Sequence, residues 1–211
     1  MTNFIAIFPL QIVVYPGEAL NLHIFEPRYK QLINDCFAAK KPFGIPAIIN
    51  DKISEVGTLV EVIEITKLYE NGEMDVKTSG TDIFKILEIV KEVPDKAYGG
   101  AIVNYPKIGY ISNKVLMEKV IEITLKLHQV LQVQKEFKRP FDELNSYDIA
   151  HHTGLALQEE YNLLNLFEEM QRQEYLKQHL LKVLPIITEM EVLKNRVQLN
   201  GHFKNLSSFD F

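Results

Sequence analysis

Few side chains in this sequence could carry out covalent chemistry, and the single cysteine, Cys36, is the first of them. Paired with a histidine, a cysteine thiolate can act as a nucleophile. Cys36, however, falls between Ile33 and Phe37 on the apolar stripe of an expected helix. Burial in apolar surroundings raises the pKa of a thiol and makes it unreactive. We therefore expect Cys36 to pack in the core.

Two adjacent histidines, His151 and His152, suggest a metal site. Neighbouring residues on a helix point about 100° apart, so both could bind one ion only with distortion. The nearest acidic residues, Asp148 and Glu159, complete no known ligand spacing. We expect these histidines to form hydrogen bonds at the surface or between helices, and we predict no metal site.

Two pairs of neighbouring glutamates, Glu159–Glu160 and Glu168–Glu169, resemble acid–base pairs. Consecutive helical residues diverge, and both pairs fall in phases expected to be exposed, so solvated helix faces are the simpler interpretation. His23 has no recognisable partner in the sequence. The sequence therefore predicts no catalytic, cofactor-binding or metal-binding residue, and no cofactor.

The stretch "FEPRY" joins an apolar strand to a helix through Phe25, Glu26, Pro27, Arg28 and Tyr29. Proline suits the first helical position, where its missing N–H has no intrahelical partner to lose. Glu26 lies near the positive end of the helix dipole, and Arg28 can pair with it or with a neighbouring strand. A site for an anion or a peptide carboxylate is the alternative. We expect a structural motif that attaches the helix to the sheet.

The secondary structure expected to hold these residues changes from strands to helices halfway along the chain. The first half shows about seven short apolar strands and one helix, with a tight turn at Asn71–Gly72 and a bulge near Ile63, as in a small barrel or sandwich. The second half steps by four and three residues from Ser112 onward, which indicates helices with long buried seams. A short helix is expected from Ser146, and a kink or break at Pro185.

This pattern predicts an α+β protein with two parts. Residues 1–108 would form a β-rich subdomain with one helix, and residues 109–211 an all-helical subdomain with a loose tail from residue 200 onward. We find no internal repeat and no low-complexity segment.

Composition excludes several classes of protein. The 211 residues carry a net charge of −5, with 10 basic and 14 acidic residues in 1–105 and 13 and 14 in 106–211. Neither half has the positive footprint of a nucleic-acid-binding protein. No apolar stretch reaches the about 18 residues of a membrane helix, and the first residues do not form a signal peptide. With one cysteine, a reducing, cytoplasmic location is expected.

The residues "FPLQIVVYPGEALNLHIFEPRYKQLIND" (8–35) resemble the opening of the Lon protease N-terminal domain family. Further correspondences are Phe43–Gly44, Val56–Gly57–Thr58 and the segment 80–84, and a looser match runs through 145–176. Two departures stand out: Ile83 replaces the family's usual arginine, and the helical "RL" is replaced by Glu174–Tyr175–Leu176, with Arg172 shifted.

This resemblance implies a PUA-like β pseudobarrel followed by a helical bundle, and recognition of polypeptide substrates. The sequence contains no G-x-x-x-x-G-K-[ST] motif for an ATPase and no room for the family's serine–lysine protease module, so it predicts a module that is not an enzyme.

Two functions remain open at this stage. The first is a protein-binding or peptide-binding module that recognises unfolded or exposed hydrophobic segments, as an adaptor or accessory to ATP-dependent proteolysis. The alternative is a small-molecule binder or a hydrolase whose site is not legible in sequence. Expected partners are polypeptide substrates or a protease, without nucleic acid or membrane. The protein itself would be a monomer or a weak homodimer, and its peptide-binding residues are not identified by the sequence.

Overall fold

The computed structural model describes residues 3–137 and 139–205, and the chain forms two compact units. Unit 1 comprises the residues up to Tyr110 together with Leu155–Glu169. Unit 2 comprises Ile111–Gly154 and the residues from Met170 on. The sequence prediction drew one boundary between 108 and 109. The structure differs from it in the segment 155–169, which belongs with the strands.

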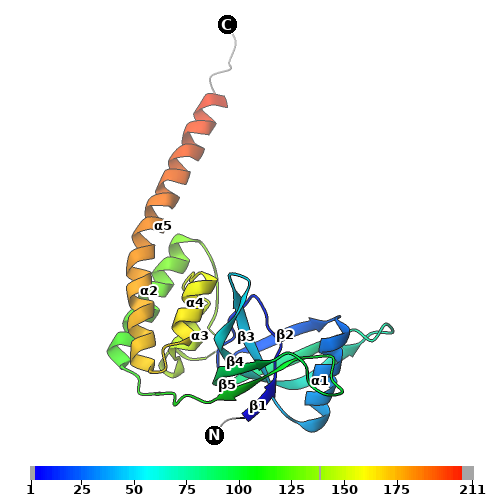
Figure 1. The fold of residues 1–211 in the computed structure, drawn as a ribbon. Coiled ribbons are helices and arrows are strands. Elements are labelled where there is room, and N and C mark those ends of the chain that lie inside the picture. The colour runs from blue at the N-terminus through cyan, green and yellow to red at the C-terminus, as the bar shows by residue number, and fades with distance from the viewer. Residues whose placement is uncertain (1–2, 138, 206–211) are drawn as a thin grey trace. The chain divides into compact units, whose positions relative to one another are not determined.

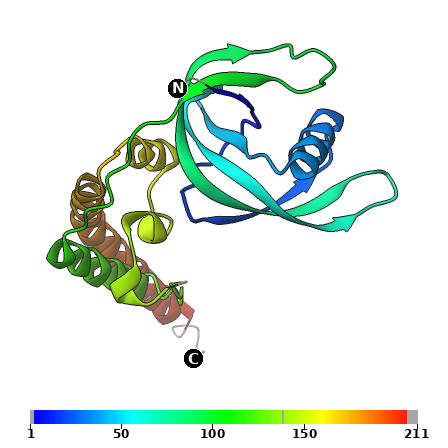
Figure 2. The ribbon, with the colours of Figure 1, turned by 90° about the horizontal axis from the view of Figure 1, so that it is seen from below.

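Unit 1 is built on one antiparallel sheet that curls into a pseudobarrel, seen from below in Figure 2. The sheet order is β1-β6-β5-β4-β3, and β2 pairs with the first half of β5. Residues 7–10 bridge in parallel to β3, where the Phe8 amide donates to the Gly44 carbonyl at 2.8 Å, and this contact closes the sheet. The strands are β1 (Asn3–Ala6), β2 (Ala19–Ile24), β3 (Phe43–Ile49), β4 (Lys52–Leu68), β5 (Met74–Val90) and β6 (Gly100–Asn104).

The β4–β5 hairpin dominates the sheet, because each of its strands is 17 residues long. The predicted turn is present: Gly72 has a φ of 76°, and the Tyr69 amide donates to the Glu73 carbonyl at 2.8 Å. The register of the hairpin shifts between Val62 and Glu64, at the expected bulge. β4 and β5 are each one long strand where we expected several short ones. Bulges bend the two strands but do not end them.

Helix α1 (Pro27–Ala39) lies against the sheet between the β4–β5 loop and the β5–β6 loop, as Figure 2 shows. Its apolar stripe buries Tyr29, Leu32, Ile33 and Cys36. Phe37, expected on the same stripe, is 43% exposed. Eight residues after Tyr29 it lies about 80° around the helix axis, at the edge of the stripe, and the left-handed Lys40 ends the helix soon after. Each fully buried large apolar side chain contributes roughly 1.5–3 kcal/mol to stability, so the stripe is a main attachment of α1.

Apolar side chains on both sides of the sheet form the core of unit 1. One cluster lies around α1 and includes Leu32, Ile33, Phe43 and Val60. The second gathers around the fully buried Phe84. Two glycines make room for the Phe84 ring: a Cβ at Gly44 or at Gly57 would lie 2.7 or 2.6 Å from its Cζ. Glycine is therefore required where these strands pass the ring.

Helix α4 (Leu157–Leu164) completes unit 1 from a distant part of the sequence. The Tyr15 hydroxyl donates to the Glu160 carbonyl at 3.1 Å, and the Val56 amide donates to the Tyr161 hydroxyl at 3.4 Å. Nearby, the Gly109 amide donates to the Phe167 carbonyl at 2.8 Å. These bonds, with the buried Leu163 and Leu164, fix the segment to the β unit.

Unit 2 is helical and contains α2 (Lys114–Val130), the short η1 (Phe141–Glu143), α3 (Ser146–Ala150) and α5 (Glu169–Asn205) (Figure 1). Only the first residue of α5, Glu169, belongs to unit 1. The seam predicted for α2 is buried at Val120, Ile123 and Leu127. Leu176 and Leu180 of α5 are also fully buried. The α+β prediction, a β pseudobarrel with one helix followed by helices, is thus confirmed.

Helix boundaries differ from the predicted ones where a neighbouring residue is the better cap. Asn113 caps α2 in place of Ser112, and Asn145 caps α3 in place of Ser146 through a reciprocal capping box with Asp148. Pro185 lies inside a continuous α5 and does not split it. Residues 200–205 extend this helix, whereas 206–211 of the expected loose tail lie outside the described residues. No described helix is long and apolar enough to cross a membrane.

The packing around Phe84 yields a stability prediction. We expect Gly44→Ala to lower the free energy of unfolding by about 1–3 kcal/mol, as overpacking of a core does. Adding Phe84→Leu should make the loss of stability in the double variant smaller than the sum of the two single losses. The shorter side chain removes the clash with the Phe84 ring, although Ile5 Cδ1 still lies 2.7 Å from the added Cβ.

The control is Gly80→Ala, whose Cβ would lie 2.3 Å from the Tyr15 carbonyl oxygen, a backbone atom that Phe84→Leu leaves in place. Denaturant titration of all variants measures the coupling. Equal coupling for the Gly44 and Gly80 variants would contradict the packing described here.

Candidate functional site

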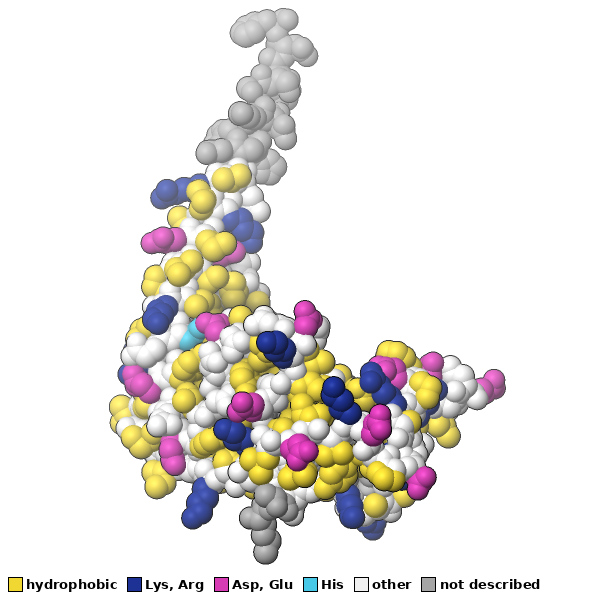
Figure 3. Space-filling model, in the orientation of Figure 1, with side chains coloured by type: hydrophobic (Ala, Val, Ile, Leu, Met, Phe, Trp, Pro, Cys, Tyr) yellow, Lys and Arg dark blue, Asp and Glu magenta, His cyan; other side chains and the backbone are white. Residues whose placement is uncertain are grey.

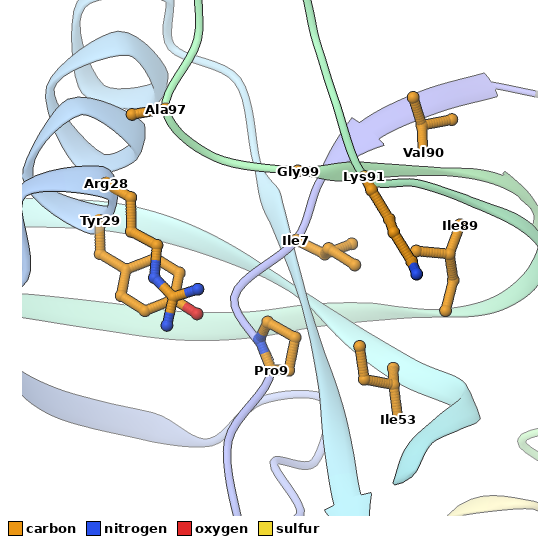
Figure 4. A pocket seen from close by; sticks show the side chains of 10 residues that line it. All are labelled: Ile7, Pro9, Arg28, Tyr29, Ile53, Ile89, Val90, Lys91, Ala97 and Gly99. Atoms are coloured by element: carbon orange, nitrogen blue, oxygen red, sulfur yellow. The ribbon is translucent and has the colours of Figure 1, made fainter.

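An apolar groove of about 280 Å³ opens on unit 1 beside the start of α1 (Figure 4). Its walls come from the segment after β1, the first turn of α1, the start of β4, the end of β5 and the β5–β6 loop. We call it the α1 groove. Its lining residues are Ile7, Pro9, Arg28, Tyr29, Ile53, Ile89, Val90, Lys91, Ala97 and Gly99.

The "FEPRY" motif supplies one wall of the α1 groove. Pro27 starts α1, so the side chains of Arg28 and Tyr29 leave the first turn on the groove side (Figure 4). The Tyr29 ring stacks on Phe8 with centroids 3.9 Å apart, and the Arg28 guanidinium lies 4.5 Å from the Tyr29 centroid. Arg28 Nε donates to Glu26 Oε2 at 2.9 Å. Arg28 therefore pairs within its own motif, the first of the two expected arrangements.

The β5–β6 loop forms another wall and is tied to α1 by polar contacts. Asp35 accepts from Lys96 Nζ and from the Tyr98 hydroxyl, each at 2.8 Å. Gln31 accepts from the Ala97 amide at 2.7 Å and donates to the Asp95 carbonyl at 3.2 Å. The hydrogen bond from Lys96, then that from Tyr98, lowers the pKa of Asp35. The loop is thus positioned by the same helix that carries the motif.

The α1 groove combines aliphatic walls with two cationic side chains, Arg28 and Lys91. Ile53 and Ile89 remain 37% and 41% exposed, so apolar surface is available to a ligand. Among the described residues that line the groove there is no histidine, cysteine or carboxylate. This lining can bind apolar groups and attract a negative charge, and it offers no acid–base pair for hydrolysis.

A second hollow, of about 400 Å³, lies between the end of α1 and β4. Phe37 and Ile63 contribute its exposed apolar surface, and Lys40, Lys41 and Glu61 its charges. Cys36 also lines it, but only 7% of that residue is exposed. Burial raises the pKa of the Cys36 thiol to about 11, so the thiol stays protonated, as expected for a core residue.

His23 gains partners that the sequence could not reveal. It pairs across the sheet with Asp75, at 2.7 Å between Nδ1 and Oδ1, and its Nε2 lies 3.4 Å from Glu73. The hydrogen bond to Asp75 raises the pKa of His23 and lowers that of Asp75, which also accepts from the Tyr69 hydroxyl at 2.8 Å. This cluster is exposed on the β4–β5 hairpin and is separate from the residues of the α1 groove.

The two adjacent histidines lie just after α3, outside a helix. His151 is exposed, whereas the ring of His152 lies 4.7 Å from that of Phe137 between centroids, and the His152 carbonyl accepts from His128 Nε2 at 2.9 Å. His152 therefore takes part in inter-element packing of unit 2. No group of three or more potential metal ligands occurs among the described residues.

One expectation about the glutamates is wrong. Glu169 is only 2% exposed, while Glu168 is exposed as predicted. Glu169 is the first residue of α5, where the helix dipole favours a carboxylate, and its amide donates to the Gly109 carbonyl at 3.0 Å. Glu159 is half-buried and accepts from the Ala156 amide at the start of α4.

Comparisons with known proteins agree on one family. The sequence model of the ATP-dependent protease La (LON) substrate-binding domain matches residues 5–191. Curated protein sequences yield no match.

Two solved structures share the fold. A Lon N-terminal domain protein from Xanthomonas campestris superposes with a TM-score of 0.61 at 23% identity, over 82% of this chain and 96% of that one. The N-terminal domain of the Mycobacterium avium complex Lon protease superposes with a TM-score of 0.62 at 12% identity, over 84% and 98%.

The hydrogen bonds that Asp35 accepts from the β5–β6 loop predict that the attachment of this loop to α1 weakens at low pH. Because the folded pKa of Asp35 lies below its ordinary value of 3.8, its contribution to stability is complete above that value and is lost as the pH falls through the folded pKa. We expect the loop to detach from α1 at that point, and Asp35→Asn to weaken its attachment already at neutral pH.

Hydrogen exchange at the Ala97 amide measures this attachment. Lys77→Ala serves as the control, because it removes only the exposed Lys77–Glu64 pair on the β4–β5 hairpin. Unchanged protection of Ala97 in Asp35→Asn would show that Asp35 does not hold the loop.

Proposed function

The chain belongs to the family of ATP-dependent protease La (Lon) substrate-binding domains, and from that membership we propose that it binds exposed hydrophobic segments of other polypeptides in the α1 groove. The observation that carries this proposal is the position of the "FEPRY" motif. Arg28 and Tyr29, within the stretch on which the family resemblance rests, are also walls of an apolar groove.

The lining supports a polypeptide ligand with particular chemistry. An apolar side chain can enter between the aliphatic walls, where each square ångström of apolar surface removed from water contributes about 25 cal/mol. Arg28 already pairs with Glu26, while Lys91 makes no ion pair within the described part of the chain. Lys91 therefore favours a ligand with an acidic residue beside its apolar side chain.

A binding role also fits what the groove lacks. Catalysis of hydrolysis requires an activated nucleophile or a general base within reach of the substrate. The groove presents one tyrosine and two cations, and burial raises the pKa of Tyr29 further. We therefore favour recognition over hydrolysis or small-molecule turnover, and an accessory role in which bound polypeptides are passed to an ATP-dependent protease.

The test compares one groove residue with one exposed residue elsewhere on the same hairpin. We expect Ile89→Asp to weaken binding of a fluorescent unfolded polypeptide, such as reduced and carboxymethylated lactalbumin, by about 10–100-fold, because it places a charge in the apolar wall. Leu68→Asp, at a 68% exposed position on β4 outside the groove, should leave affinity unchanged.

Fluorescence anisotropy gives both affinities, and circular dichroism checks that both variants are folded. Lys91→Glu should weaken binding of acidic segments selectively. Equal affinity of Ile89→Asp and the unaltered protein would remove the α1 groove from consideration as the binding site.

A further inference from the structure

The second half of α5 carries large apolar side chains that remain exposed in the described part of unit 2. Leu176 and Leu180, early in the helix, are fully buried. From residue 186 onward the large apolar side chains other than the half-buried Ile187 are exposed in the described part of the chain, and Figure 3 shows yellow side chains along this helix. The four that matter here are Ile186 (57% exposed), Met190 (60%), Leu193 (62%) and Val197 (62%).

These four side chains follow each other at steps of four, three and four residues, so they form one stripe along the helix. We call it the α5 stripe. Alternating steps of four and three are the spacing with which two helices pack side by side in a coiled coil. In heptad notation, Ile186 and Leu193 occupy position d, and Met190 and Val197 occupy position a. A lone helix in water gains nothing from such a stripe.

We propose that the α5 stripe packs against the same stripe of a second copy of the chain, as a parallel two-stranded coiled coil. Leu193 at d with the β-branched Val197 at a is the combination that favours parallel dimers, and Ile186 and Met190 extend the apolar seam by one heptad.

The charges beside the α5 stripe fit the same arrangement. Glu189 occupies position g and Lys194 position e of the next heptad, five residues later. In a parallel pair, position g of one helix faces that position e of the other. Each dimer therefore gains two Glu189–Lys194 pairs by symmetry. Within one copy, Lys194 pairs with the half-buried Glu191 at 3.2 Å, and an ion pair at a helix surface contributes little to stability.

Two valines on α5 give a matched cross-linking test. In a parallel coiled coil, position a of one helix lies next to position a of the other, so Val197→Cys should form a disulfide-linked dimer on mild oxidation. Val192→Cys, at the outward position c and 46% exposed, should remain monomeric. The natural Cys36 gives little background because it is buried. Equal cross-linking of both variants, or none in either, would overturn the proposal.

Charge reversal tests the partner and the orientation together. Glu189→Lys alone and Lys194→Glu alone each create two like-charge pairs in the homodimer, so each should raise the dimer dissociation constant about tenfold. An equimolar mixture of the two variants restores both opposite-charge pairs and should dimerise at least as tightly as the unaltered protein.

Sedimentation equilibrium on the full chain measures all three samples, and circular dichroism checks that helix content is retained. A mixture no tighter than its components would overturn the parallel arrangement. An unaltered protein that stays monomeric up to about 1 mM, the range of the weakest specific associations, would overturn self-association itself.

Discussion

The apolar face of α1 is the interaction on which unit 1 depends. Leu32 and Ile33 are fully buried in the cluster that also contains Phe43 and Val60 of the sheet. Because this face fixes the helix, its polar side can hold the hairpin loops: Lys30 donates to the Asn71 carbonyl at 3.1 Å on one side, and Asp35 and Gln31 hold the β5–β6 loop on the other. The α1 groove is a by-product of that attachment, since two of its walls are the helix and the loop.

The strand and helix positions around α1 could be predicted because they depend on local periodicity. Pro27 marks the start of α1, and the apolar stretch 43–49 forms β3, one of the short strands expected in the first half. Asn71–Gly72 predicts the turn of the long hairpin, where Gly72 takes the positive φ. Such features require no knowledge of distant contacts, and the family resemblance through residues 8–35 reinforced them.

The groove and the partners of His23 could not be predicted, because they depend on residues far apart in sequence. Asp75 lies opposite His23 only when β2 pairs with β5, a pairing that no local pattern specifies. Ile53 and Ile89 likewise meet Tyr29 only after the barrel closes. The burial of Glu169 could not be predicted for a related reason. Helical phase alone does not show that a residue begins a helix and that its amide donates to the Gly109 carbonyl.

The return of the chain to unit 1 at residues 155–169 has a consequence for synthesis on the ribosome. Tyr15 and Val56 find their partners on α4 only after 145 and 105 further residues, respectively, have been made. Domains generally fold in the order in which they emerge, yet here the first unit stays incomplete until the first segment of the second, Ile111–Gly154, has been synthesised. A nascent chain halted at residue 110 would expose the surface that α4 covers, and it would be a natural target for chaperones.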